Sequence, residues 1–147
     1  MSKNDDFDDF VNRLQEEIDK KEKEIYSDEV LEEYHHPKNL GALSDEECDA
    51  FGEAASDSCG DNMLMYLKVK DNVIIDIKFR TDGCGVTTAV GSRLTTLVKG
   101  KTIEDAKQLS AADLEKSLGG LPKEHTHCTR LGIAALTNAI ENYLKIV

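Results

Sequence analysis

Apolar residues between positions 5 and 25 recur at spacings of three, four and seven on a charged background, a pattern typical of an amphipathic helix. A second, shorter helix is expected after Ser27, which suits the N-cap position and is followed by two acidic residues. It must end before Pro37, because proline disfavours helical geometry in the residue before it. The apolar positions of the first helix are Phe7, Phe10, Val11, Leu14, Ile18 and Ile25.

Two segments alternate apolar and polar residues and are expected to form β-strands. They span residues 63–70 and 73–80, and Asp71-Asn72 between them supplies a hairpin turn. A shorter alternation at 51–55 predicts a further strand, so that an antiparallel sheet of about three strands results. The apolar positions expected to share a face are Met63, Met65, Leu67 and Val69 on one strand and Val73, Ile75, Ile77 and Phe79 on the next.

Helical spacing of apolar residues returns after the sheet, at residues 86–98 and at about 127–145. Between these segments, Thr102 and Ser110 each precede an acid three residues later, as in a capping box, and predict two short helices. Because strands come first and helices follow, the predicted class is α+β, with helices packed on one face of the sheet. The last helix is expected to place on one side Leu131, Leu136, Ile140, Tyr143 and Leu144.

The composition limits the expected cellular location of the protein and the classes of partner that it can bind. The chain has 147 residues, 39% of them apolar, which suffices for one domain whose core needs no disulfides. A formal net charge of -11 repels phosphate backbones and anionic lipids, so nucleic acids and membranes are poor partners. The sequence has no signal-peptide pattern and no apolar run of membrane-spanning length, so we expect a cytoplasmic protein with reduced thiols.

Three of the four cysteines lie in contexts that favour metal chemistry. Cys59 lies in the turn Ser58-Cys59-Gly60-Asp61, which brings a thiol and a carboxylate together. Cys84 lies between two glycines at the expected start of a helix, and Cys128 follows His127 at the start of the last helix. Because helix N-termini stabilise thiolates, we expect three exposed thiols that are good metal ligands.

Thiolates bind iron, zinc or copper(I), and a tetrahedral site needs four donors, so either Asp61 or His127 would complete the set. The candidate ligands lie far apart in the sequence, and an oxygen or imidazole donor takes the place of a fourth cysteine sulfur. Both features favour a site whose metal can exchange. Three other interpretations stay open. Each cysteine alone suits a small buried hydrophobe, and Cys128 activated by His127 or His125 suits a thiol enzyme. The third is a zinc-bound sulfur-acceptor (sulfurtransferase-type) module, with Zn²⁺ on the same ligands.

Several short blocks of the sequence, in one order, resemble the IscU-type scaffold proteins and the N-terminal module of NifU, on which iron-sulfur clusters are assembled. The blocks are Tyr26-Ser27, His36-Pro37-Lys38-Asn39-Leu40-Gly41, Cys59-Gly60-Asp61, Gly83-Cys84-Gly85, Val98-Lys99-Gly100-Lys101, Leu121-Pro122 and His127-Cys128. The resemblance covers about residues 26–147 and leaves residues 1–25 as an N-terminal amphipathic helical extension. It implies an α+β fold with a curved three-stranded antiparallel sheet.

The resemblance also implies what these residues do. Cys59, Cys84 and Cys128, with Asp61 or His127, would hold a [2Fe-2S] cluster, and Fe²⁺ would enter at Asp61 and the cysteines. A cysteine desulfurase would deliver persulfide sulfur to Cys128, a ferredoxin would supply electrons, and apo iron-sulfur proteins would receive the cluster. A frataxin-like protein is a further expected partner. Such a protein is a scaffold and carrier, not an enzyme.

Some positions depart from the family pattern. The chaperone motif Leu-Pro-Pro-Val-Lys is replaced by Leu121-Pro122-Lys123-Glu124-His125, which does not favour recognition by the dedicated Hsp70, and His125 becomes a candidate spare ligand. The related SufU group has a longer insertion before its third cysteine and lacks a histidine beside it, so His127 favours the IscU side. Cys48, in an acidic stretch, is interpreted as a surface thiol. The extension 1–25 is interpreted as a solvated cap, with a docking helix or a homodimer helix as alternatives.

Overall fold

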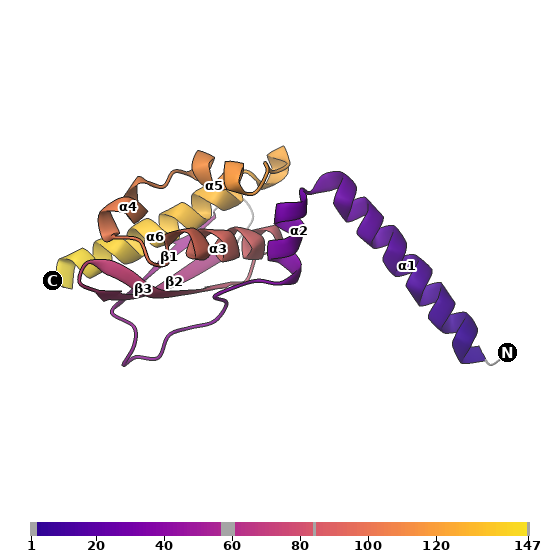
Figure 1. Ribbon diagram of the computed structural model, residues 1–147, viewed down its shortest axis with the longest axis horizontal. Coiled ribbons are helices and arrows are strands. Elements are labelled where there is room, and N and C mark those ends of the chain that lie inside the picture. Colours follow the sequence, from indigo (N-terminus) through magenta and orange to yellow (C-terminus); the bar gives the residue numbers. More distant parts are fainter. Residues whose placement is uncertain (1–2, 57–60, 84, 147) are drawn as a thin grey trace.

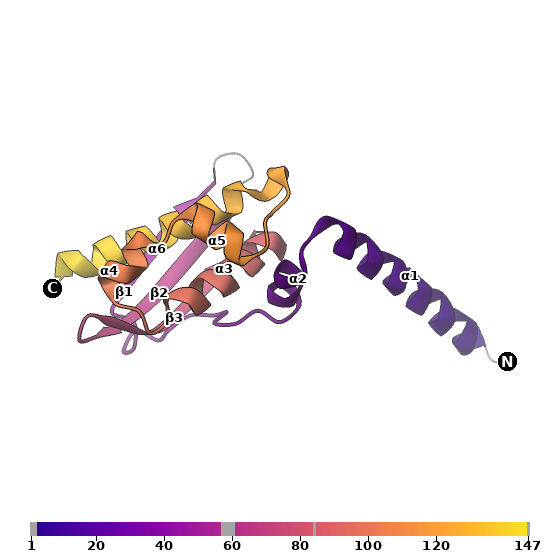
Figure 2. The same ribbon diagram turned by 45° about the horizontal axis from the view of Figure 1, so that its top comes forward.

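A small antiparallel sheet supports the body of the protein, whose computed structural model describes residues 3–56, 61–83 and 85–146 (Figure 1). The sheet has the order β1-β2-β3, from β1 (Ala50–Ala55), β2 (Asn62–Lys70) and β3 (Val73–Thr81). Two long helices, α3 (Gly85–Val98) and α6 (His127–Ile146), cover one face of it (Figure 2). The predicted α+β class, with helices on one face of a three-stranded sheet, is therefore confirmed.

The shorter helices begin at the residues that their capping signals predicted. The Ser27 side chain accepts a hydrogen bond from the backbone N–H of Val30 at 3.1 Å and starts α2 (Asp28–His35). Ser110 and Asp113 form a complete capping box at the start of α5 (Ala111–Ser117). The Thr102 side chain caps α4 (Ile103–Gln108), and a single 3₁₀ turn (Lys123–His125) precedes α6. Local sequence signals thus fixed where these helices begin.

The buried face of the sheet differs from the predicted alternation at one position of β3. Met63, Met65 and Leu67 on β2 are fully buried, as expected, and so are Ile77 and Phe79 on β3. Nearer the start of β3, however, Ile74 is buried in place of the predicted Ile75, which is 41% exposed. The pairing register shifts between Lys68 and Val69, which is the mark of a β-bulge. A bulge inserts one residue into the alternation and so reverses which side chains point inward beyond it.

The last helix buries most of its predicted face. Leu131, Leu136 and Ile140 are buried against the sheet and α3. Tyr143 is half-buried and packs against this core, as predicted, whereas Leu144 is 41% exposed, so the prediction was wrong for Leu144. The difference arises because the last turn of α6 lies at the end of the helical layer, where fewer neighbours cover it (Figure 1).

The first helix, α1 (Lys3–Ile25), projects away from the body and meets it through the short link to α2 (Figure 1). Its position agrees with the amphipathic segment expected at residues 5–25. Across the described ranges, none of the helices combines the length and the apolar character that crossing a bilayer requires.

Candidate functional site

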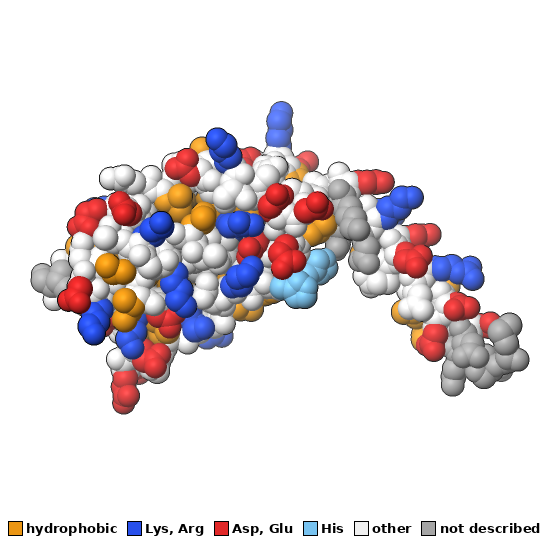
Figure 3. All heavy atoms as spheres, viewed as in Figure 1, with side chains coloured by type: hydrophobic (Ala, Val, Ile, Leu, Met, Phe, Trp, Pro, Cys, Tyr) orange, Lys and Arg blue, Asp and Glu red, His pale blue; other side chains and the backbone are white. Residues whose placement is uncertain are grey.

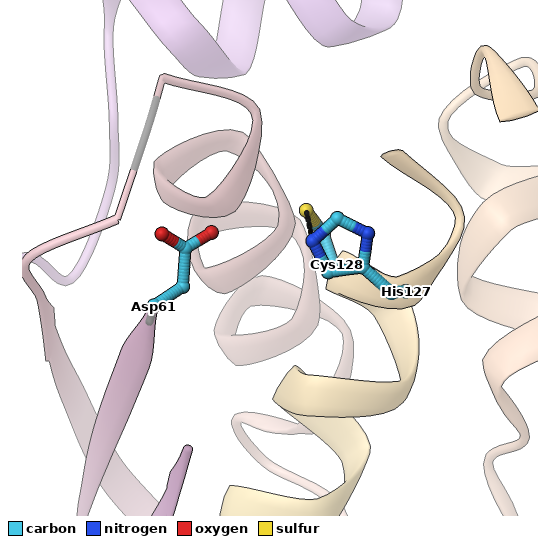
Figure 4. A group of neighbouring side chains, drawn as sticks. All are labelled: Asp61, His127 and Cys128. Carbon is cyan, nitrogen blue, oxygen red and sulfur yellow. Dashed lines mark hydrogen bonds between the residues drawn. The ribbon is translucent and has the colours of Figure 1, made fainter. Parts of the chain in front are cut away.

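Three potential ligands from two distant parts of the sequence meet at one end of the sheet. Asp61 lies immediately before β2, and His127 and Cys128 are the first two residues of α6. One possible ligand atom from each residue lies within 4.8 Å of the others, and the Asp61 carboxylate points toward the thiol and the imidazole (Figure 4). We call these residues the Asp61–His127–Cys128 cluster.

Thr87 of α3 connects the members of this cluster. Its hydroxyl donates a hydrogen bond to Asp61 Oδ2 at 3.2 Å and lies 3.5 Å from Cys128 Sγ. The Cys128 sulfur is in turn 3.7 Å from His127 Nε2. Thr87 was not among the predicted site residues, although its position in the sequence gave a signal. It lies three residues after Cys84, and residues at this spacing share one face of a helix.

Cys128 is more deeply placed than predicted. We expected an exposed thiol, but the Cys128 side chain is fully buried, whereas Asp61 and His127 are half-buried. The reason is that the first turn of α6 packs against α3, so that the buried Thr87 side chain lies against the thiol. The helix N-terminus still offers its positive dipole end to a thiolate there.

A reciprocal pair of hydrogen bonds joins the first residue of β2 to the residue that follows β3. The backbone N–H of Asn62 donates to Asp82 Oδ1 at 3.1 Å, and the backbone N–H of Asp82 donates to Asn62 Oδ1 at 3.3 Å. The next residue, Gly83, then lies against the cluster: a Cβ atom there would be 3.0 Å from Asp61 Cγ and 2.8 Å from the Thr87 hydroxyl. Only glycine fits this close approach without displacing its neighbours.

Two of the predicted ligands, Cys59 and Cys84, lie outside the described residues, so their convergence with the cluster stays a prediction. The described residues next to them are informative. Asp61 belongs to the cluster itself, and Gly83 contacts it. On the opposite side of position 84, Gly85 packs against the ring of Tyr34, leaving no room for a Cβ atom.

Neither His125, the candidate spare ligand, nor Cys48 belongs to the cluster. His125 Nε2 lies 3.4 Å from the Tyr26 hydroxyl, so this imidazole packs toward the start of α2. The Cys48 thiol donates to the backbone oxygen of Ala50 at 3.2 Å, before β1. Burial raises the pKa of Cys48, and the negative charges of Asp49 and Asp45 raise it further. Such a thiol stays protonated and is a poor ligand at neutral pH.

A carboxylate, an imidazole and a thiol lie together in this small α+β body, where two helices and a strand begin. Proteins that bind a soft metal use such a set of donors. Comparison with known proteins is more specific. The family model "NifU-like N terminal domain" matches residues 25–147, and the chain belongs to this family. The resemblance to IscU and NifU seen in the sequence is thereby confirmed.

Two relatives illustrate the similarity in sequence. The chain is 43% identical over 121 residues to the iron-sulfur cluster assembly scaffold protein IscU 1 of Archaeoglobus fulgidus, covering 82% of this chain and 78% of the relative. It is 42% identical over 120 residues to the nitrogen fixation protein NifU of Azotobacter chroococcum, covering 80% of this chain but 38% of that longer protein.

Solved structures agree in fold. The NifU-like protein (N-terminal) from Brucella abortus superimposes with a TM-score of 0.66 at 23% identity, covering 84% of this chain and 96% of that one. The putative SUF-system scaffold protein from Fervidobacterium islandicum gives a TM-score of 0.63 at 21% identity, over 78% and 96% of the two chains. These likenesses support the fold alone.

Proposed function

We propose that this protein is a scaffold on which an iron-sulfur cluster is assembled and from which it is handed to apo-proteins. The observation that carries the proposal is the convergence of Asp61, His127 and Cys128, whose ligand atoms lie within 4.8 Å of one another although two separate segments supply them. Membership of the NifU-like N terminal domain family supports it independently. The protein's role is to hold and release its cargo rather than to turn over a substrate.

The cargo in this proposal is a [2Fe-2S] cluster held by Cys59, Cys84 and Cys128. Asp61 or His127 supplies the fourth donor. Fe²⁺ enters through Asp61, because a carboxylate oxygen is a hard donor that suits ferrous iron and exchanges faster than a thiolate. Thr87 orients this carboxylate, and Gly83 keeps the neighbouring loop close to it. A site with one exchangeable donor suits assembly and transfer better than permanent storage.

Sulfur arrives from a cysteine desulfurase as a persulfide. The Cys128 thiolate attacks the outer sulfur, a new S–S bond forms on Cys128, and the desulfurase cysteine leaves as its thiolate. Two electrons, delivered one at a time by ferredoxin, then break this S–S bond, which releases the transferred sulfur as sulfide and regenerates the Cys128 thiolate. A frataxin-like protein is a further proposed partner, apo iron-sulfur proteins receive the cluster, and the cytoplasm is the proposed location.

Anaerobic reconstitution tests this function. The full-length protein is incubated with Fe²⁺, sulfide and a reductant, desalted, and examined by visible absorption. We expect the absorption of a [2Fe-2S] cluster, followed by its loss when apo-ferredoxin is added and by the appearance of holo-ferredoxin. A protein that stays colourless under these conditions would rule out the scaffold function.

A zinc-bound sulfur-acceptor module is the second candidate, because a thiolate, an imidazole and a carboxylate also suit Zn²⁺. It predicts one tightly held Zn²⁺ that a cluster does not displace. It also predicts that a desulfurase transfers radioactive sulfur to Cys128 only in the zinc-loaded protein. Reconstitution after removal of zinc by a chelator separates the two functions, because only the scaffold then gains colour.

A further inference from the structure

The last helix caps the free edge of the sheet with two asparagines. β1 is an edge strand, and the Asn142 side-chain amide of α6 donates a hydrogen bond to the backbone oxygen of Phe51 at 2.8 Å. Asn138, one helical turn earlier, donates to the backbone oxygen of Glu53 at 2.8 Å. The two bonds satisfy carbonyl groups that an edge strand otherwise offers to another chain.

The spacing of these two bonds predicts where a third one would form. Four residues of a helix rise about 6 Å and two residues of a strand rise about 6.7 Å, so side chains four apart on α6 meet every second carbonyl group of β1. The third position of this series is Ala134 on the helix and Ala55 on the strand. Because an alanine side chain has no hydrogen-bond donor, Ala134 provides no cap at this position.

The backbone groups of Ala55 point away from β2. The N–H of the next residue, Ser56, donates to the backbone oxygen of Asp61 at 2.8 Å and so faces β2. Neighbouring residues in an antiparallel pair of strands alternate in the direction of their backbone groups, so those of Ala55 face the outer side of the edge. They have the same direction as the two carbonyl groups that the asparagines cap.

A groove lies at this uncapped position. Ala54, Ala55 and Ala134 line it, and their small side chains let another backbone approach closely. An extended peptide can therefore add to the edge of β1 here, with its main chain paired to Ala55. His127 also lines the groove and belongs to the Asp61–His127–Cys128 cluster, so the groove adjoins the candidate site.

The burial of Cys128 favours a narrow occupant for this groove. Sulfur transfer requires a donor cysteine within bonding distance of the Cys128 sulfur, and this side chain is fully buried. A flat protein surface does not bring a cysteine that close, whereas a single extended segment needs little space. The groove offers such a segment main-chain hydrogen bonds next to the cluster.

Charge offers a partner less guidance on the face drawn in Figure 3. Acidic and basic side chains are interspersed over the body there, so no field of a single sign marks a docking area on that face (Figure 3). Pairing with the main chain of β1 gives affinity without a charged patch.

We propose that this groove binds the cysteine-bearing segment of the sulfur donor, which adds to β1 at Ala55 as a short strand. The inference rests on the proposed scaffold function, because it names the docking site of the sulfur donor in that function. The bound segment presents its persulfide to Cys128. The Cys128 thiolate forms an S–S bond with the outer sulfur, and the donor cysteine leaves as its thiolate.

Ala134→Asn tests the proposal, because it completes the series of capping asparagines. The new side chain occupies the groove and donates to the Ala55 oxygen, so the rate of sulfur transfer to Cys128 should fall about tenfold, as the loss of main-chain hydrogen bonds to the donor predicts. The donor in this assay is a cysteine desulfurase supplied with radioactive cysteine. Thr137→Asn adds the same side chain at another exposed position of α6 and should accept sulfur at the wild-type rate.

Reconstitution with inorganic sulfide separates docking from cluster binding. Sulfide needs no donor protein, so Ala134→Asn should form a cluster as the wild type does. A wild type that stays colourless with sulfide would contradict the scaffold function itself and not only the docking site. Amide hydrogen exchange of the wild type gives a second measurement: the Ala55 N–H should exchange more slowly when the desulfurase is bound, because a paired strand protects it.

Three results would overturn the proposal. One is sulfur transfer to Ala134→Asn at the wild-type rate. A second is an Ala55 amide whose exchange does not change when the desulfurase binds, and this result decides alone if Ala134→Asn also fails with sulfide. The third is an Ala134→Asn variant that accepts sulfur normally but delivers its cluster slowly to apo-ferredoxin, which would assign the groove to the acceptor proteins.

Discussion

The Thr87 hydroxyl donates a hydrogen bond to the Asp61 carboxylate at 3.2 Å, and this bond joins α3 to the start of β2 at the centre of the candidate site. Thr87 is fully buried and also lies 3.5 Å from the Cys128 sulfur. A side chain that touches two proposed ligands fixes their relative orientation. Its contribution can be measured apart from that of the ligands themselves.

We expect Thr87→Val to weaken the binding of Zn²⁺ or Fe²⁺ roughly tenfold, because groups that orient metal ligands typically contribute this much. Valine keeps the shape of threonine but cannot hold the Asp61 carboxylate. An anaerobic competition titration against a chromophoric chelator gives the affinity. Thr88→Val, at the half-buried neighbouring position, is the matched control. Equal affinities in the two variants would show that Thr87 does not orient the site.

A buried carboxylate, that of Glu33, fastens α2 to α3. Glu33 is 3% exposed; Ser92 donates to its Oε2, Lys38 Nζ lies 3.2 Å from Oε1, and Arg93 Nε lies 3.5 Å from Oε1. The carboxylate is the common partner of all three groups. Because α3 carries Thr87, which contacts Asp61 and Cys128, this contact supports the helix that orients the site.

Glu33→Ala should lower the free energy of unfolding by about 2 kcal/mol, since it leaves the buried Ser92 hydroxyl and the Arg93 guanidinium without their acceptor. The full cost of a broken buried ion pair is not expected, because Lys38 and Arg93 are partly solvated. Urea unfolding followed by circular dichroism gives the value. Glu32→Ala removes the exposed neighbouring carboxylate and should change stability by less than about 0.5 kcal/mol. Similar losses of stability in both variants would show that the Glu33 carboxylate does not hold α2 against α3.

Local signals in the sequence predicted most of the fold. The caps at Ser27 and Ser110, the alternation of β2 and the helix that opens with His127-Cys128 all depend on neighbours a few residues away. The position of Ile75 was missed because a bulge depends on pairing with another strand. A period-two pattern carries no information about such a register shift.

The sequence predicted the ligands of the candidate site but not the residues that position these ligands. The residue types and motifs of Asp61, His127 and Cys128 pointed to one centre, and the structure brings these three together. The burial of Cys128 and the roles of Thr87 and Glu33 arise from contacts between α3 and residues distant in sequence. Contacts between residues that are distant in sequence produce no periodic pattern of apolar residues, so the sequence alone did not predict them.

Alkylation of Cys48 should require a higher pH than alkylation of an unperturbed thiol. Burial raises the pKa of Cys48, and the negative charges of Asp49 and Asp45 raise this pKa further. A raised pKa means that the folded protein holds this proton more tightly than the unfolded chain does. The associated stability is present below the unfolded pKa and is lost as the pH rises through the folded pKa. Site-resolved mass spectrometry of iodoacetamide labelling should therefore give a half-maximal rate at higher pH in the folded protein than in urea.

Asp45→Asn provides the control for Cys48. It removes one of the smaller causes of the shift, so the labelling profile should move slightly toward lower pH while remaining above that of the unfolded chain. Coincident profiles for folded and unfolded protein would contradict the prediction. Cys48→Ser should leave cluster reconstitution unchanged, because Cys48 is not part of the Asp61–His127–Cys128 cluster.

Asp61→Ala should slow the transfer of a reconstituted cluster to apo-ferredoxin about tenfold, equivalent to about 1.4 kcal/mol in the barrier. The carboxylate is the exchangeable donor of the proposed site, and an incoming thiolate displaces it more readily than a bound thiolate. Stopped-flow circular dichroism in the visible range follows the cluster from one protein to the other. Glu141→Ala, which removes an exposed carboxylate farther along α6, should transfer at the wild-type rate.

The same assay on His127→Ala decides which residue is the fourth ligand. If Asp61 binds the cluster, Asp61→Ala changes the visible circular dichroism spectrum and His127→Ala leaves it unchanged, because the imidazole then only neighbours Cys128 at 3.7 Å. The reverse pattern would assign the fourth position to His127 and restrict Asp61 to iron entry. Transfer at the wild-type rate in both variants would remove both residues from the proposed release step, because an exchangeable donor must affect release when it is lost.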